Sequence, residues 1–293
     1  MARAQVGSPG GSTGGQKHPQ QRGRQPGPHG RKPGGWARGC GCALLIVLVL
    51  AVIGAVGFGV AALSSKNFSG DNRVDVPDNV PPAAAKPAPL VNIHAPGRTA
   101  LQLTDWARPL SEQTGIPVQA LVAYANAESI ATQSRPQCHV TWNTLAGLGF
   151  VETRHGTYNG VRYGAAELNQ NGVATPGITG PPLDGNGFAK IEDTDNGDLD
   201  GDKQWDRAVG PLQFIPDSWR RYGVDANGDG KADPQQIDDA AASAVRLLCD
   251  FDRDLSTPEG WTKAISAYNL SGEYVRKVRD AAANYALNQR PAV

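Results

Sequence analysis

The chain has 293 residues, with 28 Lys or Arg against 28 Asp or Glu, a length that suits one ordinary domain with appendages or two small domains. The zero net charge averages two unlike regions, because residues 1–38 carry seven basic side chains and no acidic one, while the rest of the chain is acidic. This balance excludes a uniformly basic nucleic-acid-binding protein, and we expect no nucleic-acid partner.

Residues 1–38 consist mainly of Gly, Pro, Gln, Ser and Arg, with almost no apolar side chains. Such a composition cannot bury enough surface to offset the entropy of ordering, so we predict a disordered basic tail. Its charges are spread among glycines rather than clustered on a helix. This favours a solvated tail that sets membrane topology over one that binds nucleic acid or anionic lipid.

Residues 39–65 contain no charged side chain, and the apolar run from 43 to 63 is 21 residues long. As a helix this run would measure about 30 Å, the thickness of a bilayer core. More basic residues precede it than follow it closely, so we predict a single-pass helix in the cell membrane, with the N-terminus cytoplasmic and the rest extracytoplasmic. A cleaved signal peptide is the alternative, although its apolar core is usually shorter.

Residues 66–97 hold six prolines among small and polar residues. This composition favours an extended polyproline conformation over a packed fold. We therefore predict a Pro-rich linker that acts as a spacer between the membrane and the domain that follows.

Residues 98–293 are predicted to form one mainly α-helical domain, because apolar residues recur there at helical spacing and strand-like alternation is scarce. Helices are expected over residues 117–130, from about 145 to near Gly156, over 238–251, and after the caps Thr257 and Ser271. Residues 157–210 are rich in Gly, Asn, Asp and Pro and are expected to form long loops. Loops of that length inside a domain are usually functional.

Two cysteines, Cys138 and Cys249, lie far apart within the predicted domain. An extracytoplasmic location would permit a disulfide between them. Two buried free thiols are the alternative, since such thiols are common in protein cores.

Three segments carry a resemblance to a known family: GFVETRHGTYNG (149–160), AVGPLQFIPDSWRRYGVDANGDG (208–230) and AISAYNLSGEYVRKV (264–278). In content, order and spacing they resemble the MltB-type lytic murein transglycosylases in their actinobacterial form. The resemblance implies a lysozyme-like helical domain with long loops that cleaves the MurNAc–GlcNAc bond of peptidoglycan and leaves a 1,6-anhydro-MurNAc end. With the predicted anchor, this describes a membrane-bound enzyme of cell-wall remodelling.

Glu152 takes the acid/base role that the resemblance implies. Hydrolysing glycosidases usually need two carboxylates, whereas attack by the sugar's own C6 hydroxyl lets one carboxyl protonate the leaving oxygen and then accept the hydroxyl proton. Such a carboxyl must be protonated at neutral pH, which an apolar pocket and the negative end of a helix dipole both favour. By the same resemblance, Gln213, Tyr268 and Asn269 should bind the substrate.

Two other residues invite a catalytic interpretation. Glu128 precedes Ser129, and the related Slt-type enzymes place their acid in a Glu-Ser pair, but the expected downstream motifs follow Glu152 instead. We interpret Glu128 as a helix-surface residue. His155 has no catalytic task in the family that the chain resembles, and we interpret it as a surface or structural histidine.

An EF-hand-like calcium loop is indicated from residue 225 onward, with oxygen ligands at positions 1, 3 and 5 and Gly230 at position 6. Position 12 is Gln236 rather than Glu, so the standard loop is incomplete. MltB-type enzymes are known for an elongated loop of this kind, which Asp238 or Asp239 would close here. The expected ligands of a structural Ca²⁺ are Asp225, Asn227, Asp229, Lys231 and Asp239, and a metal-free acidic turn is the alternative.

Two other classes of function compete with the transglycosylase. A hydrolytic muramidase would need a second carboxylate near Glu152, with Asp193, Asp195 or Asp206 as candidates, although we interpret the acidic run at 193–202 as a solvated loop. A non-catalytic wall-binding or calcium-binding module is the other alternative. The expected partners are peptidoglycan glycan strands, the membrane, and proteins of cell-wall synthesis or division.

Overall fold

The computed structural model describes residues 74–158 and 161–292. The predicted tail (1–38) and membrane helix (39–65) lie outside these residues. Within the described ranges, no helix is both long enough and apolar enough to cross a bilayer.

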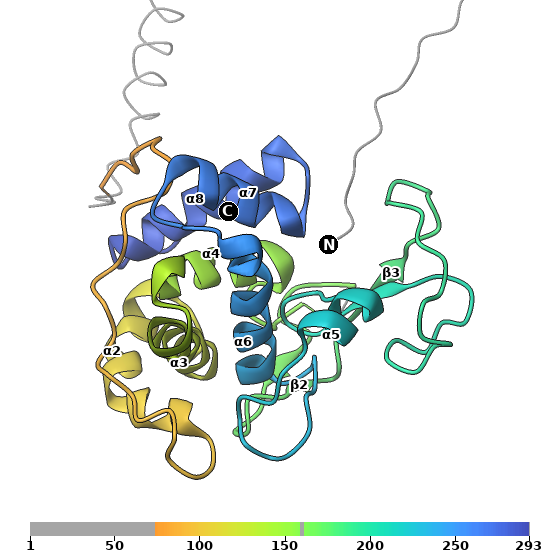
Figure 1. Ribbon diagram of the computed structural model, residues 1–293, viewed down its shortest axis with the longest axis horizontal. Coiled ribbons are helices and arrows are strands. Elements are labelled where there is room, and N and C mark those ends of the chain that lie inside the picture. Colours follow the sequence, from red (N-terminus) through yellow and green to blue (C-terminus); the bar gives the residue numbers. More distant parts are fainter. Residues whose placement is uncertain (1–73, 159–160, 293) are drawn as a thin grey trace, which may run out of the picture. The chain divides into compact units, whose positions relative to one another are not determined.

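Helices form the body of the described domain, which confirms the mainly helical prediction (Figure 1). The described ranges contain seven α-helices: α2 (Thr104–Thr114), α3 (Val118–Ser134), α4 (Trp142–Thr153), α5 (Pro216–Tyr222), α6 (Ile237–Leu248), α7 (Pro258–Tyr268) and α8 (Gly272–Ala286). Three short 3-10 helices accompany them: η1 (Thr99–Leu103), η2 (Pro136–Cys138) and η3 (Asp250–Asp252).

The starts of α7 and α8 follow from their caps. The hydroxyl of Thr257 accepts a hydrogen bond from Gly260 N, and that of Ser271 accepts one from Tyr274 N. Each cap satisfies a backbone N–H that has no partner inside its helix. Helices α2 and α5 were not predicted; α2 has no side-chain cap and contains Pro109, and α5 spans only seven residues.

The core is built around α3, whose residues are buried on nearly all sides, as expected of a central helix. Helix α3 packs on α6, and α4 packs extensively on α8. The backbones of α4 and α8 approach closely at Gly147, where a Cβ atom would lie 2.7 Å from Val278 O. Large side chains fill the centre, among them Trp142, Trp261, Tyr124, Tyr268, Tyr285 and Phe214.

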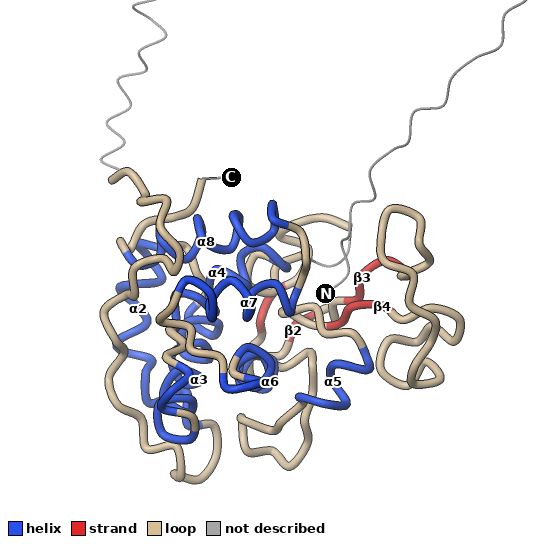
Figure 2. Tube along the Cα trace, turned by 45° about the horizontal axis from the view of Figure 1, so that its top comes forward, coloured by secondary structure: helices blue, strands red, loops and turns tan. Residues whose placement is uncertain are grey.

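The region from 157 to 210, predicted as loops, also contains two small antiparallel sheets (Figure 2). Strand β1 (Glu167–Leu168) pairs with β2 (Ala174–Thr175), and β3 (Thr179–Pro182) pairs with β4 (Arg207–Val209). The long loop between β3 and β4 extends away from the helices (Figure 1).

Residues 74–97, here called the strap, lie against the helices instead of forming the free spacer that their composition predicted. They contain no helix or strand, in agreement with their prolines. Asn143, which is fully buried, accepts a hydrogen bond from Ala85 N and donates one to Ala83 O, each of 3.0 Å. Val91 is also buried. The strap therefore packs with the helices of the domain whose predicted start was residue 98.

Further contacts follow along the strap. Trp142 Nε1 donates to Lys86 O over 3.1 Å, and Arg279 pairs with Asp78 at 2.9 Å. At its N-terminal end, Val74 exchanges two hydrogen bonds with the amide of Gln289.

A disulfide joins Cys138 to Cys249, with 5.4 Å between their Cα atoms and a sequence separation of 111. It connects η2, just before α4, to the end of α6. Of the two alternatives that the sequence left open, the structure therefore contains the bridge.

Candidate active site

Glu152 lies in the last turn of α4, one residue before the helix ends. The chain then reverses through three consecutive left-handed residues, Arg154, His155 and Gly156, with φ angles of 52°, 62° and 83°. The Glu152 carboxyl is partly exposed, and its Oε1 accepts a hydrogen bond from the hydroxyl of Tyr274. The helix end thus presents one carboxyl that is held by a phenol.

Tyr274, in the first turn of α8, was not among the predicted site residues. It is 8% exposed, and burial raises the pKa of its hydroxyl, as does the neighbouring Glu152 carboxylate. The phenol therefore stays protonated and acts as a donor. The sequence predicted the helix that follows Ser271 but gave Tyr274 no role in the site.

Tyr268 and Asn269, at the end of α7, were predicted to bind substrate. The Tyr268 hydroxyl is buried, and within the described part of the chain it has no hydrogen-bond partner. Burial raises the pKa of Tyr268 well above its usual value, and the charge of Glu152 adds to this effect. Asn269 Oδ1 accepts from Ser271 N over 2.9 Å. The structure therefore brings both residues into the neighbourhood of Glu152 and Tyr274.

Gln213 lies in the tight turn that follows β4, with φ of 50°. Its Nε2 donates to Gly210 O over 3.0 Å, which braces the turn. Gly210 is required there, because its φ is positive and a Cβ atom would lie 1.8 Å from Pro234 O. Thr153 Oγ1 donates to Pro211 O over 2.6 Å, so the residue next to Glu152 is bonded to the turn that carries Gln213.

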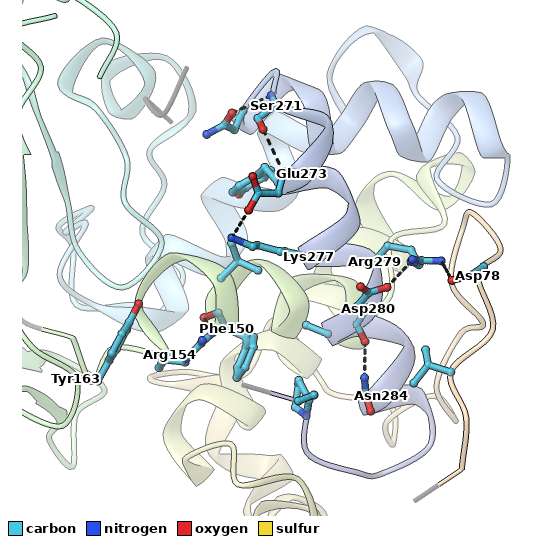
Figure 3. A pocket seen from close by; sticks show the side chains of 17 residues that line it. Asp78, Phe150, Arg154, Tyr163, Ser271, Glu273, Lys277, Arg279, Asp280 and Asn284 are labelled. Carbon is cyan, nitrogen blue, oxygen red and sulfur yellow. Dashed lines mark hydrogen bonds and ion pairs between the residues drawn. The ribbon is translucent and has the colours of Figure 1, made fainter. Parts of the chain in front are cut away.

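A cavity of about 610 Å³ lies between α4, α8 and the strap, and Glu152, Tyr268 and Gln213 are not among its lining residues (Figure 3). Asn269 and Tyr274 line it, and so do charged side chains that are paired with one another. Lys277 bonds to Glu273 at 2.7 Å across one turn of α8, and Arg279 contacts Asp78 of the strap. The wall of this cavity therefore includes part of the segment that was predicted as a spacer.

Neither Glu128 nor His155 is a fully exposed side chain. Glu128 is half-buried and accepts a hydrogen bond of 3.1 Å from Trp142 N at the start of α4, so it is more than the surface residue we expected. Burial raises the pKa of Glu128 to about 7, against the opposing effect of that N–H. His155 is 3% exposed, and burial, with help from Arg154, lowers its pKa to about 3. The imidazole is therefore neutral.

The predicted calcium loop has an ordered backbone. Asp225 accepts hydrogen bonds of 2.7 Å from Gly228 N and Gly230 N, so the first ligand position organises the turn that follows it. Asp239 is buried and accepts from the backbone N–H groups of Ala226 and Asn227. This arrangement suits Asp239 as the closing residue of the loop.

Gln236, at position 12, and Asp238, the other candidate for closing the loop, have partners elsewhere. Gln236 Oε1 accepts from Asp238 N and Asp239 N and thereby caps α6. The Asp238 carboxylate pairs with Arg98 at 2.8 Å. Burial raises the pKa of Asp239 to about 6, against the opposing effect of the backbone N–H groups that it accepts from.

Three other carboxylates converge in the loop between β3 and β4. Oxygens of Asp193, Asp195 and Asp206 lie within 4.8 Å of one another, a grouping that the carboxylates of the 225–239 loop do not reach in the described structure. Asp206 is buried and accepts two hydrogen bonds of 2.8 Å from Thr194. Asp193 and Asp195 belong to the run at 193–202 that was predicted to form a solvated loop, but together with Asp206 they form a partly buried acidic cluster.

Residues 188–266 match the family model described as the transglycosylase SLT domain. Neither the curated proteins nor the solved structures contain a match to this chain. The family match supports a lytic transglycosylase family and implies peptidoglycan as the substrate, and the mainly helical architecture fits a lysozyme-like fold. The matched segment contains Gln213 and the 225–239 loop, whereas Glu152 and Tyr274 lie outside it.

Proposed function

We propose, from this support for a lytic transglycosylase family, that the chain is an MltB-type enzyme that cleaves the β-1,4 bond between MurNAc and GlcNAc and forms 1,6-anhydro-MurNAc. Glu152 is its acid and base. The observation that carries the proposal is the hydrogen bond from Tyr274 to Glu152, at the edge of a cavity of about 610 Å³ and next to the buried phenol of Tyr268.

In the proposed reaction, the protonated Glu152 carboxyl gives its proton to the glycosidic oxygen as the bond from C1 of MurNAc to that oxygen breaks. The C6 hydroxyl of the same MurNAc then bonds to C1 and returns its proton to Glu152. No water is consumed, and the carboxyl ends in its starting state. Tyr274 fixes the direction in which Glu152 points, so that one carboxyl is close to both oxygens in turn.

A hydrolytic muramidase would require a second carboxylate on the opposite side of the sugar. The candidates Asp193, Asp195 and Asp206 lie together in the loop between β3 and β4, which extends away from α4 and α8 (Figure 1). Their hydrogen bonds are made within that loop. This arrangement favours the single-carboxyl mechanism.

We also propose that Ca²⁺ binds the 225–239 loop as a structural ion. Asp225, Asn227, Asp229 and the backbone oxygen of Lys231 would hold it, with Asp239 closing the loop. Asp239 already accepts hydrogen bonds from the backbone N–H groups at positions 2 and 3, which supports this assignment. For the region before residue 74, we propose the single membrane helix at 39–65, which holds the enzyme at the outer face of the cell membrane. Partners in cell-wall synthesis or division are part of the same proposal.

The test is product analysis with the full chain, purified in detergent, on purified peptidoglycan. We expect muropeptides that end in 1,6-anhydro-MurNAc, and we expect Glu152→Gln to stop their formation. Glu128→Gln makes the same chemical change in α3, at a carboxyl that bonds to the start of α4, and should retain activity. Products with reducing ends, or an active Glu152→Gln variant, would contradict the proposal.

A further inference from the structure

The backbone directly after Glu152 adopts a conformation that needs external support. Arg154 and His155 both have left-handed φ angles, although neither is glycine. Side chains with a Cβ atom disfavour this region, and such residues persist where surrounding contacts hold them in place. The position of the Glu152 carboxyl therefore depends on what fixes the turn.

His155 supplies two of these contacts through its ring. Nε2 lies 2.7 Å from the hydroxyl of Tyr285, and Nδ1 lies 3.3 Å from the hydroxyl of Tyr124. A neutral imidazole donates through one nitrogen and accepts through the other, so each hydroxyl has a complementary partner. The side chain bonds the turn to α8 on one side and to α3 on the other.

Tyr124 also contacts α4 directly. A Cβ atom at Gly149 would lie 2.0 Å from the Tyr124 hydroxyl, so only glycine permits the phenol to reach the backbone there. His155 N donates to Gly149 O over 2.8 Å. Gly149 lies three residues before Glu152 and His155 three residues after it. Tyr124 contacts both of them, so the three residues hold the chain on either side of Glu152.

Helix α8 carries the partners of both Glu152 and His155. Tyr274 and Tyr285 are eleven residues apart, which is close to three helical turns, so they share one face of α8. Tyr274 bonds to Glu152, and Tyr285 bonds to His155. Two tyrosine hydroxyls therefore fix the end of α4 on α8 at two points.

We propose that His155 is a positioning residue for the reaction: its bonds to Tyr285 and Tyr124 hold the turn after Glu152 so that the carboxyl meets the hydroxyl of Tyr274. The inference rests on the proposed role of Glu152. It assigns a function to a buried imidazole that touches no substrate.

A double-mutant cycle tests this in the full chain, purified in detergent. Tyr285→Phe removes only the hydroxyl that His155 contacts, and His155→Phe removes both ring nitrogens while keeping an aromatic ring. We expect each to lower kcat about tenfold while KM changes less than twofold, because Glu152 and not substrate binding is disturbed. In a Tyr274→Phe background, the same substitutions should have almost no further effect, because their route to Glu152 is already broken.

Tyr222→Phe is the matched control, since it removes a tyrosine hydroxyl that bonds to Asp250 and not to α4. It should leave kcat unchanged. Losses that multiply in the double mutants would overturn the proposal, because they would show that His155 does not act through Tyr274. Melting temperatures of Tyr285→Phe and Tyr222→Phe should be similar, so that a loss of folding is not mistaken for a loss of positioning.

A crystal structure of Tyr285→Phe gives a readout that does not depend on activity. We expect the distance between Tyr274 Oη and Glu152 Oε1 to lengthen beyond a hydrogen bond, and an unchanged distance would overturn the inference. A wild-type protein that forms no anhydro product would contradict the proposed function instead, so the two failures are distinguishable.

Discussion

Glu128→Gln is expected to stabilise the protein at and above pH 7. The Glu128 carboxyl is half-buried at the start of α4, and burial raises its pKa from 4.5 to about 7. Gln keeps an oxygen that can accept the hydrogen bond from Trp142 N, and it has no charge to desolvate. The substitution therefore removes a penalty without removing the contact.

The size of the effect follows from the two pKa values. The difference between 4.5 and about 7 corresponds to about 3 kcal/mol. The unfolded chain releases this proton near pH 4.5, whereas the folded chain keeps it until about pH 7. Between these values the folded state binds more protons, so the free energy of unfolding falls as the pH rises through this window. Above it, the whole penalty is present.

Urea unfolding at pH 5 and pH 8 measures the effect. Because the unfolded chain has already released much of this proton at pH 5, the wild type should lose about 2.5 kcal/mol more between these two values than Glu128→Gln does. Burial also raises the pKa of Asp239, to about 6, so this residue too lowers the free energy of unfolding as the pH rises. Both proteins contain Asp239, so its contribution cancels when their pH dependences are compared. Parallel pH curves for the two proteins would refute the reasoning.

Three further predictions concern stability. Replacing Cys138 and Cys249 by Ser should lower the free energy of unfolding by about 5 kcal/mol, because the bridge joins residues with a sequence separation of 111. Denaturant unfolding measures this, and a loss below about 1 kcal/mol would contradict the prediction. Calcium at about 100 times its Kd should raise the melting temperature by roughly 5–10 °C, and Asp229→Ala should abolish the rise; no shift in the wild type would count against the ion. A chain that begins at residue 98 should be less stable than one that begins at 74 by about 1–3 kcal/mol or more. The shorter chain leaves the buried amide of Asn143 without its hydrogen bonds to the strap. Equal melting temperatures would show that the strap does not contribute to stability.

The sequence predicted what local chemistry decides. Thr257 and Ser271 marked two helix starts, because a cap acts on backbone groups two or three residues away. Helix α2 has no side-chain cap at its N-terminus, so the same reasoning passed over it. Composition also predicted that the strap would form no packed helix or strand, because proline sets the backbone angles of its own residue.

Long-range contacts were beyond this reasoning. The bond between Tyr274 and Glu152 joins residues 122 positions apart, and it depends on how α4 crosses α8. In the same way, the prolines of the strap do not predict the hydrogen bond between Ala85 N and the buried Asn143. Glu152 itself was assigned through resemblance, and the geometry around it adds the phenol that the pattern did not provide.

The strap gives the domain a directional response to mechanical force. Its contacts are placed one after another from the N-terminal end, first at Val74 with Gln289, then at Asp78 with Arg279, and then at Asn143. A force applied to the N-terminal end of the strap would act on these contacts one after another. They would therefore break in sequence and not all at the same time. Because Asp78 and Arg279 line the cavity beside Tyr274, tension would open one wall of the cavity before it reached α4.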